Sequence, residues 1–273
     1  LIDVLDEINT VKPAFICAVP TLLNALLNHS MTRSGTVDFS PIKLCFCGSA
    51  PLMTETQKRF EELTGGVIVE GYSLTEAQMA VVANPVVGEK KLGSVGLPLP
   101  DVDVSIVHAD DGVTPLGPGD LGEIVIRAPQ LMLGYWQRPE ETKEMIREAP
   151  SGERALFTGD LGYLDKDGYL FIVDRKKDMI NRGGEKIYCV EVEDVLCAHP
   201  AVLEAAVVGV ADAIYGEAVK ACVVARAGAS LDPEDVRRWV GTRLAKVKVP
   251  REIAVLDALP RNPNGKVIKS ALR

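Results

Sequence analysis

Two polar loops mark where this sequence could bind a ligand. Gly48-Ser49-Ala50-Pro51 follows one apolar run, and Gly71-Tyr72-Ser73-Leu74-Thr75-Glu76 follows the next one along the chain. Hydroxyl, phenol and carboxylate groups are thus concentrated just beyond two predicted strands. In open parallel sheets, ligands bind beyond the carboxyl ends of the strands. The two loops are therefore the predicted binding site.

The elements that must position these loops form a βαβ unit. The pattern predicts a strand over residues 42–47, a helix over residues 54–63 capped by Thr54, and a strand over residues 67–70. A strand–helix–strand unit of this length has parallel strands and a right-handed crossover. In the first strand, Cys45 and Cys47 alternate onto one face.

Standard nucleotide and metal signatures are absent from the sequence. Asn264-Gly265-Lys266 lacks the upstream glycine and the following Ser or Thr of a Walker loop, and no G-x-G-x-x-G follows a strand. The six cysteines contain no C-x-x-C pair and the three histidines do not cluster, so no zinc site is expected. We interpret the cysteines as buried, reduced thiols.

The rest of the chain changes character twice. Between residues 93 and 174, short β-type runs separated by Gly, Pro and Asp turns predict a small barrel or antiparallel sheet, interrupted by a helix near residues 139–147. The charge cluster Asp174-Arg175-Lys176-Lys177-Asp178 is typical of a solvated face or a linker. Beyond it, alternating helical and strand patterns, including a helix over residues 233–246, predict a small α+β domain.

Composition and charge exclude several classes of protein. Apolar residues make up 47% of the 273 residues and charged residues 25%, which is typical of a globular protein. With 30 basic and 38 acidic residues, the net charge of −8 argues against a nucleic-acid partner. The longest apolar runs fall far short of the roughly 20 residues of a membrane span. The start, Leu1-Ile2-Asp3-Val4, has neither an initiator Met nor a basic signal region, so we expect a cytoplasmic piece of a longer chain.

Seven segments occur along the chain in a fixed order: Gly48–Leu52, Glu70–Glu76, Gly122–Arg127, Met132–Trp136, Phe157–Leu161, Asp174–Ile180 and Asn264–Lys266. Each is weak alone, but together they closely resemble the adenylate-forming superfamily of acyl-CoA synthetases, peptide-synthetase adenylation domains and luciferases. The resemblance spans essentially the whole chain. The run from Gln130 to Pro139 and the D-R-K-K-D-M-I segment are most similar to the long-chain fatty-acid–CoA ligases.

The resemblance implies a two-step, AMP-forming ligase. A carboxylate attacks the α-phosphate of ATP to give an acyl-adenylate and pyrophosphate, and the thiol of coenzyme A then displaces AMP. Such chemistry requires charge compensation and in-line placement rather than a protein nucleophile. The implied small molecules are ATP or AMP, Mg²⁺, coenzyme A and a carboxylic acid, with a fatty acid as the expected substrate. The resemblance leaves open whether the protein forms a homodimer.

The resemblance also implies residue roles. Three residues would be catalytic: Lys266 would bridge the substrate carboxylate and the α-phosphate, Thr75 would donate to the α-phosphate, and Glu76 would bind Mg²⁺. Further residues would bind the cofactors. Gly48, Ser49 and Ala50 are expected to lie against the base, and Gly71, Tyr72 and Ser73 beside them, with the Tyr72 ring on adenine. Asp160 and Arg175 are expected to bind the ribose, and Gly183 and Gly184 to line the pantetheine tunnel.

The implied fold is of the α/β class, with a partial doubly wound parallel sheet, a small β-barrel-like subdomain and a small α+β C-terminal domain. The expected boundaries are residues 1–91 and 92–173 for the two parts of the AMP-binding domain, 174–177 for a hinge pivoting at Lys177, and 178–273 for the mobile small domain.

Family members carry a Ser/Thr/Gly-rich phosphate loop with a lysine in an N-terminal half that has no counterpart here, so the isolated fragment is expected to be inactive. Two alternatives stay open. The chain could belong to an adenylation domain that loads a carrier protein, or it could be a non-catalytic fragment that binds nucleotide weakly or serves as a scaffold.

Overall fold

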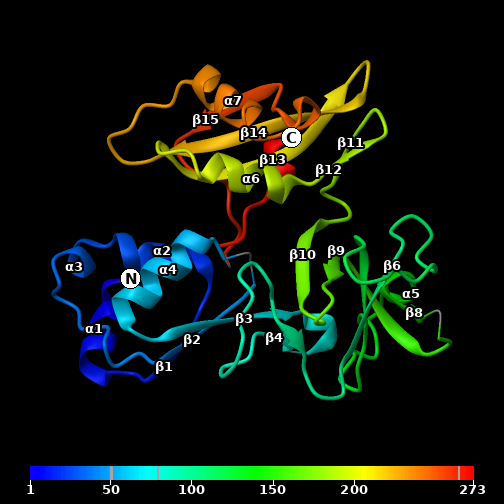
Figure 1. The fold of residues 1–273 in the computed structure, drawn as a ribbon, viewed down its shortest axis with the longest axis horizontal. Helices are drawn as coiled ribbons and strands as arrows, with labels where there is room; N and C mark the ends of the chain where they lie inside the picture. Colours follow the sequence, from blue (N-terminus) through cyan, green and yellow to red (C-terminus); the bar gives the residue numbers. More distant parts are fainter. Residues whose placement is uncertain (50–51, 79, 150, 264) are drawn as a thin grey trace. The chain divides into compact units, whose positions relative to one another are not determined.

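The computed structural model describes residues 1–49, 52–78, 80–149, 151–263 and 265–273. It divides into two compact units, Leu1–Ile172 and Val173–Arg273, and each has its own sheets and cores (Figure 1). The elements that begin in the first unit are α1 (Ile2–Val11), β1 (Phe15–Ala18), α2 (Pro20–Asn28), α3 (Ser30–Arg33), β2 (Leu44–Cys47), α4 (Thr54–Thr64), β3 (Val67–Ser73), the 3₁₀ turn η1 (Thr75–Ala77), β4 (Ala80–Ala83), β5 (Leu97–Pro98), β6 (Asp103–Val107), β7 (Gly122–Arg127), α5 (Pro139–Met145), β8 (Ile146–Glu148), β9 (Arg154–Leu164) and β10 (Leu170–Arg175).

The second unit holds β11 (Ile180–Arg182), β12 (Glu185–Ile187), α6 (Cys189–Cys197), β13 (Val202–Asp212), β14 (Gly216–Ala225), α7 (Pro233–Gly241), η2 (Lys246–Lys248), β15 (Glu252–Leu256) and η3 (Lys269–Leu272).

The first sheet contains the predicted βαβ unit. Its strand order is β1-β2-β3-β4-β5; β1, β2 and β3 are parallel, and β4 and β5 add antiparallel strands. Cys45 and Cys47 both point into a core with Phe60 of α4, as their alternation predicted. The predicted cap at Thr54 is wrong: Met53 is the N-cap residue of α4, and its side chain makes no capping hydrogen bond.

The second sheet, in the order β10-β9-β7-β6 with β8 beside β9, curves as a half-barrel. Alternate apolar residues of β7, Ile124 and Ile126, are fully buried together with Leu156 of β9. The same core includes Tyr72 of β3 and Val82 of β4. The two sheets of the first unit therefore share a core, which places the end of β3 close to β9.

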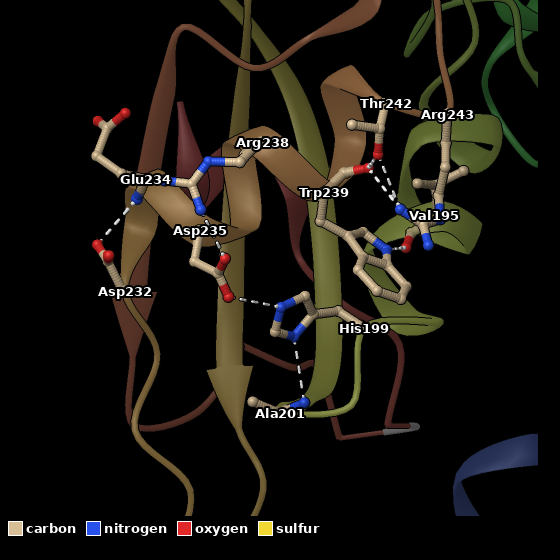
Figure 2. A network of polar contacts seen from close by, with 10 residues as sticks. All are labelled: Val195, His199, Ala201, Asp232, Glu234, Asp235, Arg238, Trp239, Thr242 and Arg243. Carbon is tan, nitrogen blue, oxygen red and sulfur yellow. Dashed lines mark hydrogen bonds and ion pairs between the residues drawn. The ribbon is translucent and has the colours of Figure 1, made fainter.

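The second unit is built on a sheet in the order β12-β11-β14-β13, with β15 parallel to β14. Helices α6 and α7 pack through Val192 and Val236 on one core of this sheet. Figure 2 shows a polar network that joins them: the Trp239 indole N–H donates to the Val195 carbonyl at 2.9 Å, and His199 meets the indole edge-on at 5.0 Å. Helix α7 ends at Gly241, so the predicted helix over residues 233–246 extends too far at its C-terminal end.

The fold class predicted from the sequence is confirmed. One expectation for the cysteines is wrong: Cys17 is exposed, while Cys45, Cys47, Cys189 and Cys222 are buried and Cys197 is half-buried. None of the helices that the structure describes is both long and apolar enough to span a lipid bilayer.

Candidate functional site

The two predicted ligand-binding segments lie side by side at one edge of the first sheet. The predicted end of the second strand at residue 70 is wrong, because β3 continues through Ser73 by pairing with β4. Cys47 of β2 lies opposite Glu70 of β3 in the parallel register, so Gly48 and Gly71 follow at the same edge. A Cβ on Gly71 would lie 2.5 Å from the Phe46 ring, and one on Gly48 would lie 3.1 Å from the Gly71 carbonyl oxygen. Only glycine fits such a close approach without displacing its neighbours.

Ser49 and Ser73 lie close to this edge. Ser49 has φ +71°, in the left-handed region that few residues with a side chain adopt. Ser73 ends β3 with its side chain exposed. Ala50 lies outside the described residues.

Tyr72 and Asp160 meet although they are 88 residues apart. The Tyr72 hydroxyl donates a hydrogen bond to the Asp160 carboxylate, and the two residues are 8% and 5% exposed. A buried carboxylate needs hydrogen-bond donors, and the phenol supplies one. The contact ties the carboxyl edge of the first sheet to the half-barrel sheet.

A bulge in β9 presents Asp160 to Tyr72. Phe157 pairs with Val125 and Leu161 pairs with Glu123, so the three residues Thr158-Gly159-Asp160 lie opposite one residue of β7. The Thr158 hydroxyl donates to the Ile124 carbonyl at 2.8 Å and accepts from the Asp160 N–H at 3.1 Å. Bulges of this kind redirect a side chain within a strand. Asp160 is thus a strand residue, although Gly-Asp is more common in turns.

Thr75 and Glu76 form the 3₁₀ turn after β3. Thr75 is exposed, and Glu76 is half-buried. Tyr135, which motif analysis left without a role, donates its hydroxyl to the Glu76 carboxylate, and the Met132 N–H donates to the Glu76 carbonyl at 2.7 Å. Burial and the bond to Glu76 raise the pKa of Tyr135 to about 12, so the phenol stays protonated as a donor at neutral pH. The only sequence signal for this residue was its place in Met132–Trp136.

Glu70 is a second residue at this edge that motif analysis left without a role. Burial raises the pKa of its carboxyl to about 7 from an ordinary 4.5, although the carboxyl also accepts the Leu52 N–H, which favours the ionised form. The strand pattern placed Glu70 beside the loop but gave no measure of its burial.

We expect Glu70→Gln to stabilise the chain at high pH but not at low pH. The native carboxyl resists ionisation while the unfolded one ionises freely, so its contribution to stability is fully present below about pH 4.5 and is lost as the pH rises through about 7. Glutamine stays neutral and keeps an acceptor for Leu52. Urea unfolding should show a gain of about 2 kcal/mol at pH 8 and little change at pH 4.5. Glu61→Gln, which also replaces an acceptor of a backbone N–H, is the control. A gain for Glu70→Gln that does not vary with pH would contradict the expectation.

In the second unit, Arg175 ends β10 and Lys177 follows in a turn, both exposed. The Arg175 carbonyl accepts the N–H groups of Asp178 and Met179 at 2.9 and 3.0 Å. Asp174 differs from its charged neighbours because it is only 4% exposed, and its carboxylate accepts the N–H groups of Arg175 and Cys189. Burial raises the pKa of Asp174. The charge cluster is therefore not uniformly solvated.

Gly183 and Gly184 form the turn of the β11–β12 hairpin, since Arg182 pairs with Glu185. Their φ values of +62° and +94° are those of a two-residue hairpin turn that favours glycine at both positions. The Gly183 N–H donates to the Tyr215 carbonyl at 2.8 Å, so the hairpin tip is fixed to the β13–β14 connection.

Lys266 lies in a tight turn after β15, with its side chain exposed. Asn262 binds both backbone groups of Lys266: its N–H donates to the Lys266 carbonyl, and its side-chain oxygen accepts the Lys266 N–H, each at 2.9 Å. The described site residues thus form two groups. Gly48, Ser49, Gly71, Tyr72, Ser73, Thr75, Glu76 and Asp160 belong to the first unit, and Arg175, Lys177, Gly183, Gly184 and Lys266 belong to the second.

Comparison with known proteins adds the family. The AMP-binding enzyme family matches residues 2–136, and the AMP-binding enzyme C-terminal domain matches residues 191–266. A long-chain-fatty-acid–CoA ligase of Bacillus subtilis (strain 168) is 41% identical over 271 residues, covering 99% of this chain and 47% of that protein. ATP-bound MatB from Rhodopseudomonas palustris has a TM-score of 0.89 at 36% identity, covering 99% of this chain and 52% of the other.

A second similar solved structure contains a bound reaction intermediate. The o-succinylbenzoate CoA synthetase MenE from Bacillus subtilis, in complex with the acyl-adenylate OSB-AMP, has a TM-score of 0.82 at 33% identity, covering 99% of this chain and 53% of the other.

The chain belongs to the AMP-binding enzyme family, the adenylate-forming superfamily that its motifs indicated. Within that family it is similar to the long-chain-fatty-acid–CoA ligases. It spans about half the length of the relatives and solved structures that it matches.

Proposed function

We propose that this chain provides the base-, ribose- and metal-binding edge and the small catalytic unit of an AMP-forming fatty-acid–CoA ligase. The carboxylate of the acid attacks the α-phosphorus of ATP and releases pyrophosphate, and the thiol of coenzyme A then attacks the acyl carbonyl and releases AMP. The observation that carries the proposal is the meeting of Tyr72 with Asp160 at the carboxyl edge from which Thr75 and Glu76 emerge.

Asp160 suits the ribose of the adenylate. A carboxylate can accept hydrogen bonds from two neighbouring hydroxyls, and the bulge and the Tyr72 phenol hold this one in place. Gly48 and Ser49, which follow β2 at this edge, would bring backbone groups close to the base. Arg175 would donate to the same sugar.

Glu76 suits a hard divalent cation. Mg²⁺ is bound through one or two carboxylates together with phosphate oxygens and water, and the Glu76 carboxylate is half-buried and oriented by Tyr135. When bound, Mg²⁺ would compensate charge on the phosphates. Thr75, with its exposed hydroxyl, would donate to the α-phosphate.

The second unit would serve the two steps with different residues. Lys266 would lie between the acid carboxylate and the α-phosphate in the first step, where a cation offsets the repulsion of two anions. The Gly183–Gly184 hairpin would shape the pantetheine path in the second step, after a rotation about Lys177. A fatty acid is the proposed substrate because the similar Bacillus subtilis relative is a long-chain-fatty-acid–CoA ligase. Free cysteines suit a reducing compartment, so we propose a cytoplasmic enzyme.

Binding of a non-hydrolysable adenylate by the 273-residue chain tests the site. We expect palmitoyl-sulfamoyl adenosine to bind in equilibrium dialysis. Asp160→Ala should weaken its binding about tenfold or more, because charged hydrogen bonds to the ribose are lost. The 2′,3′-dideoxy form of the mimic should bind the wild type and Asp160→Ala equally.

Tyr72→Phe is the matched variant, since it removes the Tyr72–Asp160 hydrogen bond but keeps the carboxylate. Equal weakening by Tyr72→Phe and Asp160→Ala, or a loss that persists with the dideoxy mimic, would reduce Asp160 to a structural role. No binding by the wild type would favour a scaffold instead.

A further inference from the structure

We propose that Arg261 is a positioning residue for Lys266 and that Glu204 anchors it. The inference rests on the adenylation role proposed above for Lys266. Neither residue is expected to touch substrate. Their effect would be exerted on the backbone from which the Lys266 side chain extends.

The turn from Arg261 to Val267 is closed at several points. Arg261 and Val267 form an antiparallel bridge, and the Ile268 N–H donates to the Pro260 carbonyl at 2.8 Å. Inside the turn, Asn262 binds both backbone groups of Lys266. Gly265 has φ +79°, a left-handed conformation that glycine adopts readily, so the residue just before Lys266 is a permissive point of the turn.

Arg261 holds that permissive point. Its Nη1 donates to the Gly265 carbonyl at 2.6 Å, and its Nη2 binds the Glu204 carboxylate at 2.8 Å. Glu204 belongs to β13, which pairs with β14 along most of its length. The guanidinium therefore links the peptide group preceding Lys266 to the central sheet of the unit.

This arrangement matters because a lysine side chain is long and rotates freely. An exposed ammonium stays between the attacking carboxylate and the α-phosphate only if its backbone is fixed, and a misplacement of about 1 Å can cost about 10²-fold in rate. The Arg261–Glu204 pair is itself partly exposed, at 28% and 37% for the two side chains, so it adds little to stability. Its loss should therefore affect the position of Lys266 far more than folding.

The test measures the two half-reactions separately in a full-length enzyme that carries this sequence. Arg261→Ala should slow palmitate-dependent pyrophosphate–ATP exchange about tenfold or more. Conversion of supplied palmitoyl-adenylate and coenzyme A to thioester should stay close to the wild-type rate. Arg261→Lys should recover little, because an ammonium cannot bind both oxygens as a planar fork does.

Arg237→Ala is the matched control. The Arg237 side chain is 30% exposed, binds the Glu234 carboxylate and donates to the carbonyls of Pro250 and Arg251 at 3.1 and 3.0 Å. It has the same kinds of contact as Arg261, but none of the contacts recorded for its side chain reaches the described residues of the Lys266 turn. We expect its variant to have normal rates in both half-reactions.

A double variant separates positioning from an independent role. If Arg261 acts through Lys266, exchange by the Arg261→Ala/Lys266→Ala protein should be no slower than exchange by Lys266→Ala. The proposal would be overturned if the double variant slowed exchange by the product of the two single losses, or if Arg261→Ala slowed both half-reactions equally. It would also be overturned if the Arg261→Ala enzyme were as active as the Arg237→Ala enzyme. If Lys266→Ala itself leaves exchange intact, the proposal falls together with the function on which it rests. A normal Arg261→Ala enzyme beside an impaired Lys266→Ala enzyme rejects the positioning role alone.

Discussion

Lys266→Ala in a full-length enzyme should slow adenylation about 10²-fold or more, a loss of about 3 kcal/mol in transition-state stabilisation. In the first step, its ammonium would lie between two anions in a water-poor site, where the attraction is strong. In the second step the small unit would have rotated, so conversion of supplied acyl-adenylate and coenzyme A should stay nearly normal. Pyrophosphate–ATP exchange and thioester formation, measured separately, check both expectations.

Lys143→Ala provides the control, because that side chain is also exposed and pairs only with Glu140 among the contacts recorded for it. Its rates should match the wild type in both steps. If Lys266→Ala slows both half-reactions together, the two steps do not use different residues of the small unit. Lys266 would then be a general binding or structural residue.

Lys177→Pro should impair one half-reaction about 10²-fold more than the other, because a fixed φ would hold the small unit in one orientation. The segment before it is anchored by buried Asp174, whereas Lys177 is exposed in the turn that follows. Proline is also disfavoured at the third position of a turn such as residues 175–178. The two half-reaction assays described for Lys266 provide the measurement.

Lys177→Ala is the matched variant because it removes the charge and keeps the backbone freedom, so it should act normally. Equal losses in both steps would point to general damage. Normal rates for Lys177→Pro would place the pivot elsewhere, for example between Ile172 and Val173, where the two units divide.

Much of the fold could be predicted because its signals are local. The helix from Thr54 is stopped by Gly65 at φ +66°, and β7 has the limits that its Gly and apolar residues predicted. The prediction that Thr54 caps α4 was wrong because Thr54 is the first residue of the helix and Met53 is the N-cap residue. Residue propensity alone does not show which residue precedes the first turn. The elements before residue 40 were not predicted, although the buried residues of α2, Pro20, Leu23, Leu26 and Leu27, recur at helical spacing.

The motifs predicted which residues belong to the candidate site but not how these residues contact one another. Asp160 could be selected from Phe-Thr-Gly-Asp, but its place in a bulge depends on pairing with β7, more than thirty residues earlier in the chain. The contact of Tyr135 with Glu76 depends on how distant segments pack, as does the burial that raises the pKa of Glu70. Spacing in sequence carries no information on either.

The path of one oxygen atom tests the central claim most directly. Palmitate labelled with oxygen-18 in both carboxylate positions would be given to a full-length enzyme carrying this sequence, with ATP, Mg²⁺ and coenzyme A, and the AMP analysed by mass spectrometry. If the carboxylate attacks the α-phosphorus, one labelled oxygen remains on the phosphate of AMP when the thiol displaces it. We predict one oxygen-18 atom in AMP for each thioester formed. Unlabelled AMP, or label found in inorganic phosphate with ADP as the other product, would contradict adenylate formation.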